Sequence, residues 1–217
     1  MAAPASKTVR DLNGKWVLNK ALSDSVDPAL TLQGVSWLVR KAIGAASVTL
    51  HVKQYQGAPR AAVETEPAAA EDEVATHIDI EQAVGGAGLK GTTEHRCLDN
   101  RFREHADWLF GRVRGRSRHL SLAELRALAA GEARDRGWVE DDAVARDWLP
   151  DDGPDGDADA ATTLVLSFVE SLDSDWTALQ AWGFQDVGGE RRYVRNLVVA
   201  KKGQFYSFKM VYDWAPE

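Results

Sequence analysis

Two Glu-His dipeptides are the clearest candidates for chemistry in this sequence. Glu94-His95 and Glu104-His105 lie on either side of a turn signal, Asp99-Asn100. A carboxylate that orients a histidine is a general acid/base unit. If Asp99-Asn100 is the turn of a two-residue hairpin, His95 faces Glu104 and Glu94 faces His105. Directly opposed side chains interact most strongly in a hairpin, so each face of the sheet would hold one Glu–His pair.

The same register leaves a second interpretation open. It places Arg96 opposite Arg103, which is mildly unfavourable, and a cross-strand Glu–His pair is often an ion pair with no catalytic role. Tyr212 is the remaining catalytic candidate, as a hydroxyl near the end of the chain.

Aromatic residues alternate along the last strands and could line a ligand cavity. One face of the strand over 176–184 holds Trp176, Ala178, Gln180, Trp182 and Phe184. One face of the strand over 204–214 holds Tyr206, Phe208, Met210, Tyr212 and Trp214. These rings could stack on an apolar ligand that Gln180 and Tyr212 orient. The alternative is that they pack only on each other.

A stripe of arginines alternates with small residues over 112–118. Arg112, Arg114, Arg116 and Arg118 share one face, and buried cations without partners are costly. We therefore expect the small residues between them to face inward and the arginines to face solvent. The alternative is that the arginines point inward, in which case the cavity would favour a carboxylate or polyphenol anion, and one arginine near the mouth could meet a ligand in either case.

The elements that must position these residues are short strands with close turns, which is typical of an antiparallel meander. About ten strands are expected, at about 12–19, 48–53, 75–83, 88–98, 101–110, 112–120, 162–171, 176–186, 190–200 and 204–214. Apolar residues at helical spacing predict a helix pair over about 28–43, broken at Gly34. A further helical segment is predicted over 121–136, where Ser121 and Glu124 form a capping box. The acidic stretch 149–160 is predicted to be a mobile loop, and its spacing does not match that of a calcium loop.

Composition narrows the class of protein. The chain has 217 residues and a formal net charge of -7, which argues against nucleic-acid binding. Cys97 is the single cysteine, so no internal disulfide can form. The sequence shows no signal peptide and no apolar stretch long enough to span a bilayer. We therefore expect a cytoplasmic protein without membrane insertion. No histidine or cysteine spacing predicts a metal, and no motif predicts a cofactor. The oligomeric state is left open.

Several local motifs resemble those of the intracellular fatty-acid-binding proteins. The opening Asn13-Gly14-Lys15-Trp16 is similar to the Gly-x-Trp start of that family, and 32–41 resembles its second helix. Thr76–Glu81 resembles a short Ile-rich strand, Trp182 a later barrel tryptophan, and Val211-Tyr212 the terminal strand. The chain also resembles lipocalin-like proteins of filamentous fungi, some of them encoded among secondary-metabolite genes. Met210 stands where the family has a ligand-clamping arginine, a role that Arg195 could take.

The resemblance implies one calycin-like β-barrel over 1–217, with 121–161 inserted outside the barrel and the helix pair acting as a lid. It implies reversible binding of a small hydrophobic molecule: a lipid, terpenoid or polyketide. The alternative is a cavity enzyme that catalyses cyclisation or isomerisation. The ligand-binding candidates are Trp16, Trp37, Trp108, Gln180, Trp182, Phe184, Tyr193, Arg195, Phe208 and Met210, and the catalytic candidates are Glu94, His95, Glu104, His105 and Tyr212.

Overall fold

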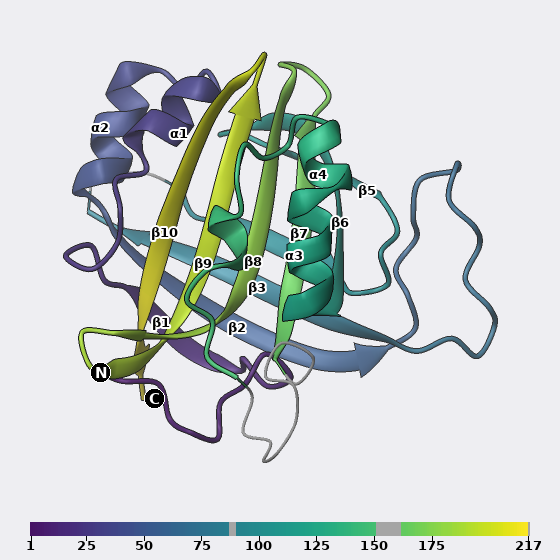
Figure 1. Cartoon of the computed structure of the whole chain (residues 1–217), viewed down its shortest axis with the longest axis horizontal. Coiled ribbons are helices and arrows are strands. Elements are labelled where there is room, and N and C mark those ends of the chain that lie inside the picture. The colour runs from purple at the N-terminus through teal and green to yellow at the C-terminus, as the bar shows by residue number, and fades with distance from the viewer. Residues whose placement is uncertain (87–89, 151–161, 217) are drawn as a thin grey trace.

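Ten strands form one antiparallel sheet that curls into a nearly closed barrel (Figure 1). The computed structural model describes residues 1–86, 90–150 and 162–216. The strands follow the order β4-β3-β2-β1-β10-β9-β8-β7-β6-β5. Their bounds are β1 Gly14–Leu18, β2 Ser47–Gly57, β3 Ala75–Gly85, β4 Thr92–Cys97, β5 Arg103–Asp107, β6 Gly111–Ser121, β7 Thr163–Ser171, β8 Trp176–Val187, β9 Glu190–Lys201 and β10 Gln204–Ala215. The predicted ten-stranded meander is confirmed.

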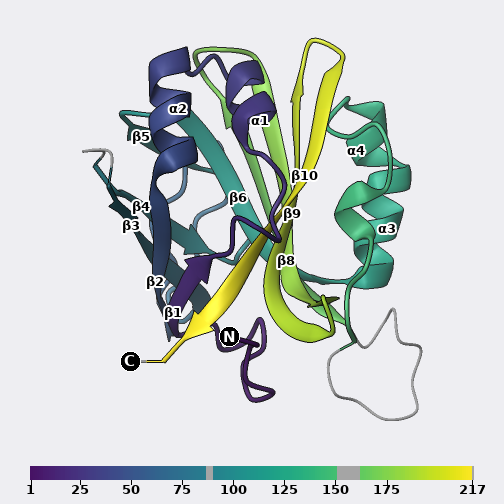
Figure 2. The same ribbon diagram turned by 90° about the vertical axis from the view of Figure 1, so that its left-hand side faces the viewer.

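Figure 2 shows the two walls of the barrel facing one another, with β8, β9 and β10 on one side and β2 to β6 on the other. Pairing of β1 with β10 joins the two ends of the chain, and Trp214 N donates to Met1 O at 3.0 Å. Because side chains alternate along every strand, each wall presents every second residue to the interior.

The barrel has one break in its hydrogen-bonded circuit, between the edge strands β4 and β5. The prediction that Asp99-Asn100 joins β4 and β5 in a hairpin is therefore wrong, because these two strands do not pair. Asn100 does adopt a turn conformation, with φ of 62°. After β4 the chain leaves β3 and crosses to β6, where Asn100 N donates to Ser117 O at 2.8 Å and Asp99 bridges to Arg118. Pairing with β6 satisfies these backbone groups, so β5 extends along β6 and away from β4. We call the break the seam.

Residues 58–74 tie the two sides of the seam together, and we call them the strap. On one side, Arg60 Nη2 donates to Asp79 of β3 at 2.8 Å. On the other, Val63 N donates to Phe102 O at 3.0 Å and Arg103 Nη2 donates to Arg60 O at 2.7 Å. Side-chain and loop contacts thus replace the missing ladder.

Two short helices, α1 Asp27–Leu32 and α2 Trp37–Ala45, cover one end of the barrel (Figures 1 and 2). Pro28 stands in the first turn of α1, where its missing N–H has no intrahelical role. Gly34 separates the helices with φ of +84°, a conformation that favours glycine. Only α1 buries residues, and Arg40 Nε joins α2 to Asp27 at 3.1 Å.

A second helical group packs on the outer surface of the β7–β9 wall. It comprises α3 Leu122–Ala130, α4 Glu132–Asp135 and the 3₁₀ turn η1 Ala143–Ala145. The predicted capping box is present, since Ser121 and Glu124 exchange side-chain-to-backbone hydrogen bonds. Beyond Pro150, the acidic stretch predicted to be a mobile loop lies outside the described residues. Among the helices that are described, none has the length and apolarity needed to cross a membrane.

Candidate functional site

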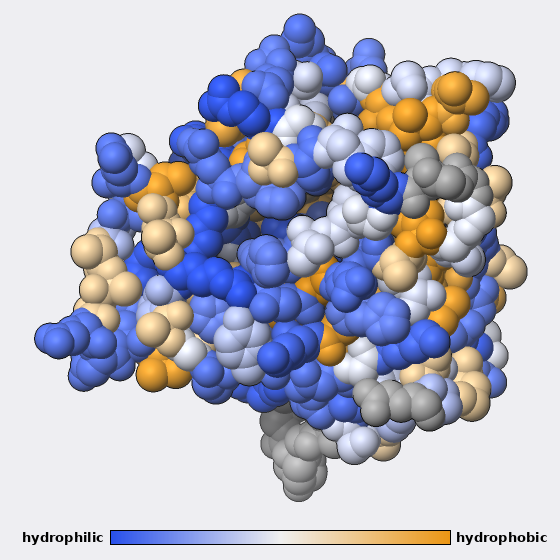
Figure 3. Space-filling view, turned by 180° about the vertical axis from the view of Figure 1, so that it is seen from behind, coloured by the Kyte–Doolittle hydropathy of each residue, from blue (hydrophilic) through white to orange (hydrophobic). Residues whose placement is uncertain are grey.

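A cavity of about 920 Å³ lies between the two walls and under the helix pair. Figure 3 views the molecule from the side of β4 and β5 and shows a hollow framed largely by hydrophilic residues. The lining residues come from the helix pair, the strap and all ten strands. A volume of this size suits a small organic ligand rather than a packed core alone.

The half of the cavity nearest α1 is apolar. Neighbouring strands place Val169, Ala178 and Val199 side by side, and Leu197 and Phe208 extend the same surface. Ala29 of α1, which is 2% exposed, belongs to the same cluster. The helix pair therefore completes an apolar compartment.

Arg195 forms the floor at the opposite end. Its side chain is 5% exposed, its Nε donates to the Tyr193 hydroxyl at 3.0 Å, and its guanidinium lies 4.0 Å from the Trp182 ring centroid. Its Nη2 has no hydrogen-bond partner among the described residues. Burial alone would lower the pKa of Arg195, but Tyr193, Tyr212 and Glu94 raise it above the ordinary value, so the cation persists.

Glu94 faces Arg195 from β4 but is held mainly by Arg96. Arg96 Nη2 lies 3.1 Å from one carboxylate oxygen of Glu94, whereas Arg195 Nη1 lies 3.7 Å from the other. Burial would raise the pKa of Glu94, but the charges of Arg96 and Arg195 outweigh it and lower the pKa. Glu94 is therefore a carboxylate at neutral pH and not a proton donor. The two arginines leave this group with one uncompensated positive charge.

Two neutral side chains stand beside Arg195 on adjacent strands. Gln180 of β8 lines the cavity, and its Oε1 accepts from Trp182 Nε1 at 3.1 Å. Tyr212 of β10 also lines the cavity, and among the described residues its hydroxyl donates only to the Met210 sulfur, at 3.8 Å. Burial raises the pKa of Tyr212, so its phenol keeps its proton.

The predicted Glu–His pairs do not form, because their strands are the two separated edges of the sheet. His95 Nδ1 instead lies 2.8 Å from Asp79, and His105 Nε2 lies 3.5 Å from Asp107. Both histidines and Glu104 border the cavity at the seam. Glu94 and His105 still lie near each other across the seam. His105 makes a small contribution to lowering the pKa of Glu94, after the larger effects of burial, which raises it, and of Arg96 and Arg195, which lower it.

The ligand-binding candidates divide by depth. Those that line the cavity are Gln180, Arg195, Phe208 and Met210. Those packed in a buried layer beyond the floor are Trp16, Trp182, Phe184 and Tyr193. Trp37 and Trp108 are 62% and 47% exposed and do not line the cavity.

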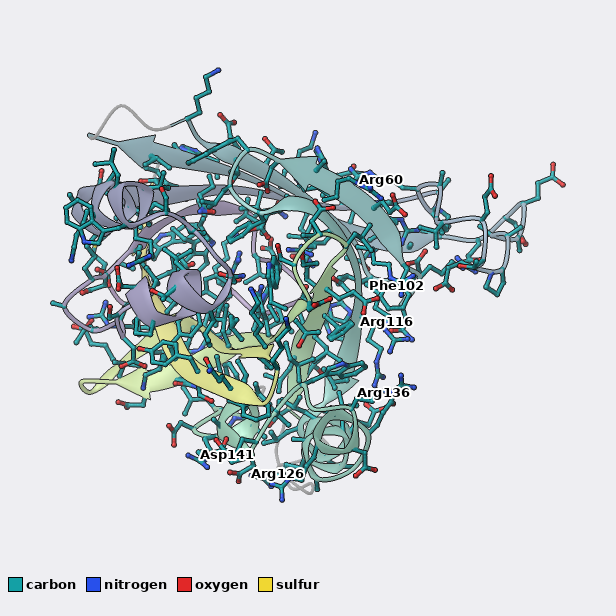
Figure 4. All side chains as sticks on the ribbon, turned by 90° about the horizontal axis from the view of Figure 1, so that it is seen from above. Arg60, Phe102, Arg116, Arg126, Arg136 and Asp141 are labelled. Carbon is teal, nitrogen blue, oxygen red and sulfur yellow. The ribbon has the colours of Figure 1, made fainter. Side chains whose placement is uncertain are left out.

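On β6, the small residues face inward as expected, whereas of the four arginines only Arg112 is exposed. Val113, Gly115 and Ser117 line the cavity, and a Cβ at Gly115 would lie 3.7 Å from Arg96 Nη1. Arg116 borders the cavity too, but its guanidinium stacks on Phe102 at 4.9 Å. Figure 4 labels these two side chains on the same side of the barrel.

Arg96 is a residue of this site that was not among the candidates predicted from the sequence. It shares a face with Glu94, two residues away, so alternation along that strand could have identified it. In the described part of the chain, no group of three or more histidine, cysteine or acidic residues could hold a metal ion.

No family model matches this chain. Two curated proteins are similar over nearly their whole length. A probable pericyclase, scpY of Mollisia scopiformis, is 28% identical over 98% of this chain and 94% of its own. The pericyclase pydY of an Acremonium species is 28% identical over 99% and 97%.

Among solved structures, the fatty acid transporter REP1-NXSQ is 11% identical over 95% of this chain and 98% of its own, with a TM-score of 0.43. A point mutant of that transporter is 11% identical over 94% and 98%, with a TM-score of 0.47.

Proposed function

We propose that this protein is a pericyclase, an enzyme that folds a flexible unsaturated metabolite and closes a ring by a concerted rearrangement of π electrons. The observation that carries the proposal is the meeting of an apolar compartment with one buried cation, Arg195, inside a single cavity. The two similar pericyclases support it, since the similarity extends over 98% and 99% of this chain.

Confinement supplies one part of the proposed rate enhancement. A linear polyene has many rotatable bonds, and the reacting carbon atoms meet in few of its conformers. Apolar walls around Ala178 and Phe208 would bury the chain in a bent form, at roughly 25 cal/mol per Å² of apolar surface. Holding the reacting ends together lowers the entropic part of the barrier.

Polarisation supplies the other part. A carbonyl conjugated to the reacting alkene would accept hydrogen bonds from Arg195, Gln180 and Tyr212, which lie on three adjacent strands. Donors that withdraw electron density from the carbonyl make the alkene a better partner for an electron-rich diene. Because these donors are already oriented by the protein, little reorganisation accompanies the reaction.

Such a reaction needs no proton transfer to or from carbon. This fits a floor in which Glu94 is ionised and bound by Arg96, and Tyr212 keeps its proton. His105 and His95 at the seam are not assigned a step.

The test uses a linear triene that carries an α,β-unsaturated ketone at its far end and cyclises slowly in buffer. We expect the purified protein to accelerate cyclisation and to enrich one stereoisomer, measured by chiral liquid chromatography. The variant Arg195→Met should lose most of the acceleration. Product ratios identical to those in buffer, over a panel of such trienes of different chain length, would argue against the proposal.

Reversible carriage of a small hydrophobic molecule is the second candidate. It is favoured by the apolar compartment that Ala29 of α1 completes. A carrier would release each triene unchanged, so mass spectrometry of the bound and released molecules separates the two functions.

A further inference from the structure

The atoms that Gln180 presents to the cavity as hydrogen-bond donors or acceptors depend on Trp182, which is buried next to it. Gln180 presents both an oxygen and an NH₂ group, and either could point toward a ligand. The indole Nε1–H of Trp182 is a donor only, so the Gln180 atom 3.1 Å away must be the acceptor Oε1. This leaves Gln180 Nε2, with two donor hydrogens, for the cavity, and no described residue accepts from it.

Trp182 cannot itself move aside easily. It is 0% exposed and lies in the buried layer with Trp16 and Phe184, and Arg195 stacks on its ring at 4.0 Å. The same indole therefore orients two of the three polar side chains on this wall. The third, Tyr212, has a thioether as its one acceptor in the described part of the chain and can donate to a stronger acceptor on a ligand.

We infer that Trp182 is the positioning residue that makes the β8–β10 wall a set of hydrogen-bond donors, and that the site selects a polar end carrying neighbouring oxygen acceptors. The side chains concerned are Gln180, Arg195 and Tyr212. A substrate end with paired carbonyl oxygens fits this wall. An end that offers only N–H groups leaves donors facing donors. A hydroxyl can accept from the wall, but its own O–H hydrogen is then left without an acceptor, and both mismatches cost binding free energy.

The acceptor on the facing wall does not change this selection. Glu94 already lies beside Arg96 at 3.1 Å and Arg195 at 3.7 Å, which compensate its charge. The inference rests on the proposed function for the identity of the occupant. Its test needs no turnover, so it can fail or succeed separately.

The probes are dodecane-2,4-dione and dodecane-2,4-diol, which share one carbon skeleton and differ in hydrogen-bond character. Calorimetric titration gives a Kd for each. For the wild-type protein we expect the dione to bind about ten-fold more tightly than the diol, as one to two mismatched hydrogen bonds would produce.

The variant Trp182→Phe keeps a ring under Arg195 and removes only the N–H. With the amide of Gln180 free to turn, the ratio of the two Kd values should fall to within about three-fold. Trp148→Phe is the matched control, because Trp148 Nε1 donates to Val144 O at 2.9 Å in the outer cluster, away from the cavity. It should keep the wild-type ratio, whatever its effect on thermal stability.

A third variant reverses the chemistry at the same place. Gln180→Glu still accepts from Trp182 but presents an acceptor to the cavity, so it should bind the diol more tightly than the dione. The inference is overturned by a wild-type ratio in Trp182→Phe, by an unchanged preference in Gln180→Glu, or by a wild-type protein that binds neither probe or prefers the diol.

Discussion

At the scale of single residues, the main feature of the site is the buried cation Arg195, which the surrounding side chains hold in one orientation inside the barrel. Arg195 is held by Tyr193 and Trp182, and its nearest carboxylate, Glu94, is held more closely by Arg96. A hydrogen bond from a charged group contributes about 1.5–3 kcal/mol. Arg195→Met should therefore lower kcat/KM for the triene probe by roughly 10- to 100-fold.

Arg195→Lys should recover little of that loss. A lysine ammonium has no planar face to stack on Trp182, and it lacks the fork of N–H donors with which a guanidinium can bind a ligand oxygen. The exposed Arg112→Met is the control and should match the wild type. Wild-type kcat/KM in Arg195→Met would remove Arg195 from the proposed mechanism.

Tyr212 makes a separate prediction about pH. Burial raises the pKa of its phenol above the ordinary value of 10.0, so the donor form persists throughout the range near and above neutral. The Tyr212-dependent part of the rate, taken as wild type minus Tyr212→Phe, should stay constant from pH 7 to about 10. A fall in that part with a midpoint near 10 would show an ordinary, accessible phenol.

At the scale of elements, β8 has two buried faces with different tasks. Ala178 faces the apolar compartment of the cavity, whereas Ala181 packs against the outer helical group. Ala178→Phe should fill space that a ligand needs, and so weaken binding of dodecane-2,4-dione at least about ten-fold with little change in Tm.

Ala181→Phe is the counterpart on the same strand. It overpacks a filled core and should destabilise the fold by about 1–3 kcal/mol while the cavity keeps its shape. Thermal unfolding and calorimetry of the two variants give the comparison. Equal loss of stability in both would mean that Ala178 also faces a packed core.

Asp99, which lies beside the strap and binds Arg103, leads to a prediction about stability in acid. Burial would raise the pKa of Asp99, but hydrogen bonds from Arg103 and from the Arg101 backbone outweigh it and lower the pKa from 3.8 to about 2. Since the folded pKa is the lower one, this stabilisation is fully present above pH 3.8 and disappears as the pH falls through about 2. The difference between the unfolded and folded pKa values of Asp99 corresponds to about 2 kcal/mol of stability. Because the Asp99 side chain is only 4% exposed, solvent screening reduces this contribution little.

Denaturant unfolding of wild type and Asp99→Asn between pH 6 and 2 measures this contribution. The wild type should be the more stable above pH 4, and the difference should narrow as the pH falls. Parallel stability curves for the two proteins would contradict the assignment to Asp99.

At the scale of the whole molecule, the barrel is closed by two different means. Backbone ladders join nine neighbouring pairs of strands, and backbone and side-chain contacts of the strap close the seam between β4 and β5. Edge strands lack partners on one side, so they should open locally more often than β8 and β9. Amide hydrogen exchange should be faster in β4 and β5 by at least about two orders of magnitude, and equal protection would mean that the seam is closed in solution.

The sequence by itself determined the local structure. Alternation along β6 correctly placed Val113, Gly115 and Ser117 on the cavity face, since neighbouring side chains in a strand must point to opposite faces, although Arg116 of the stripe also reaches the cavity edge. Turn and cap residues such as Gly34 and Ser121 located the helix boundaries, and the strands followed from the same short-range signals. These features depend on residues within a few positions of one another.

Only the tertiary structure decided which edges meet and how deep each side chain lies. Whether β5 pairs with β4 or with β6 depends on closure of the whole barrel, and a local turn signal at Asp99-Asn100 contains no information about it. Alternation assigns Gln180, Trp182 and Phe184 to one face, but the distance along the barrel axis makes the first a cavity residue and the others part of the buried layer. Tyr193 and Trp182 lie near Arg195 in sequence, whereas Glu94 belongs to a distant strand, so only folding brings Glu94 to Arg195.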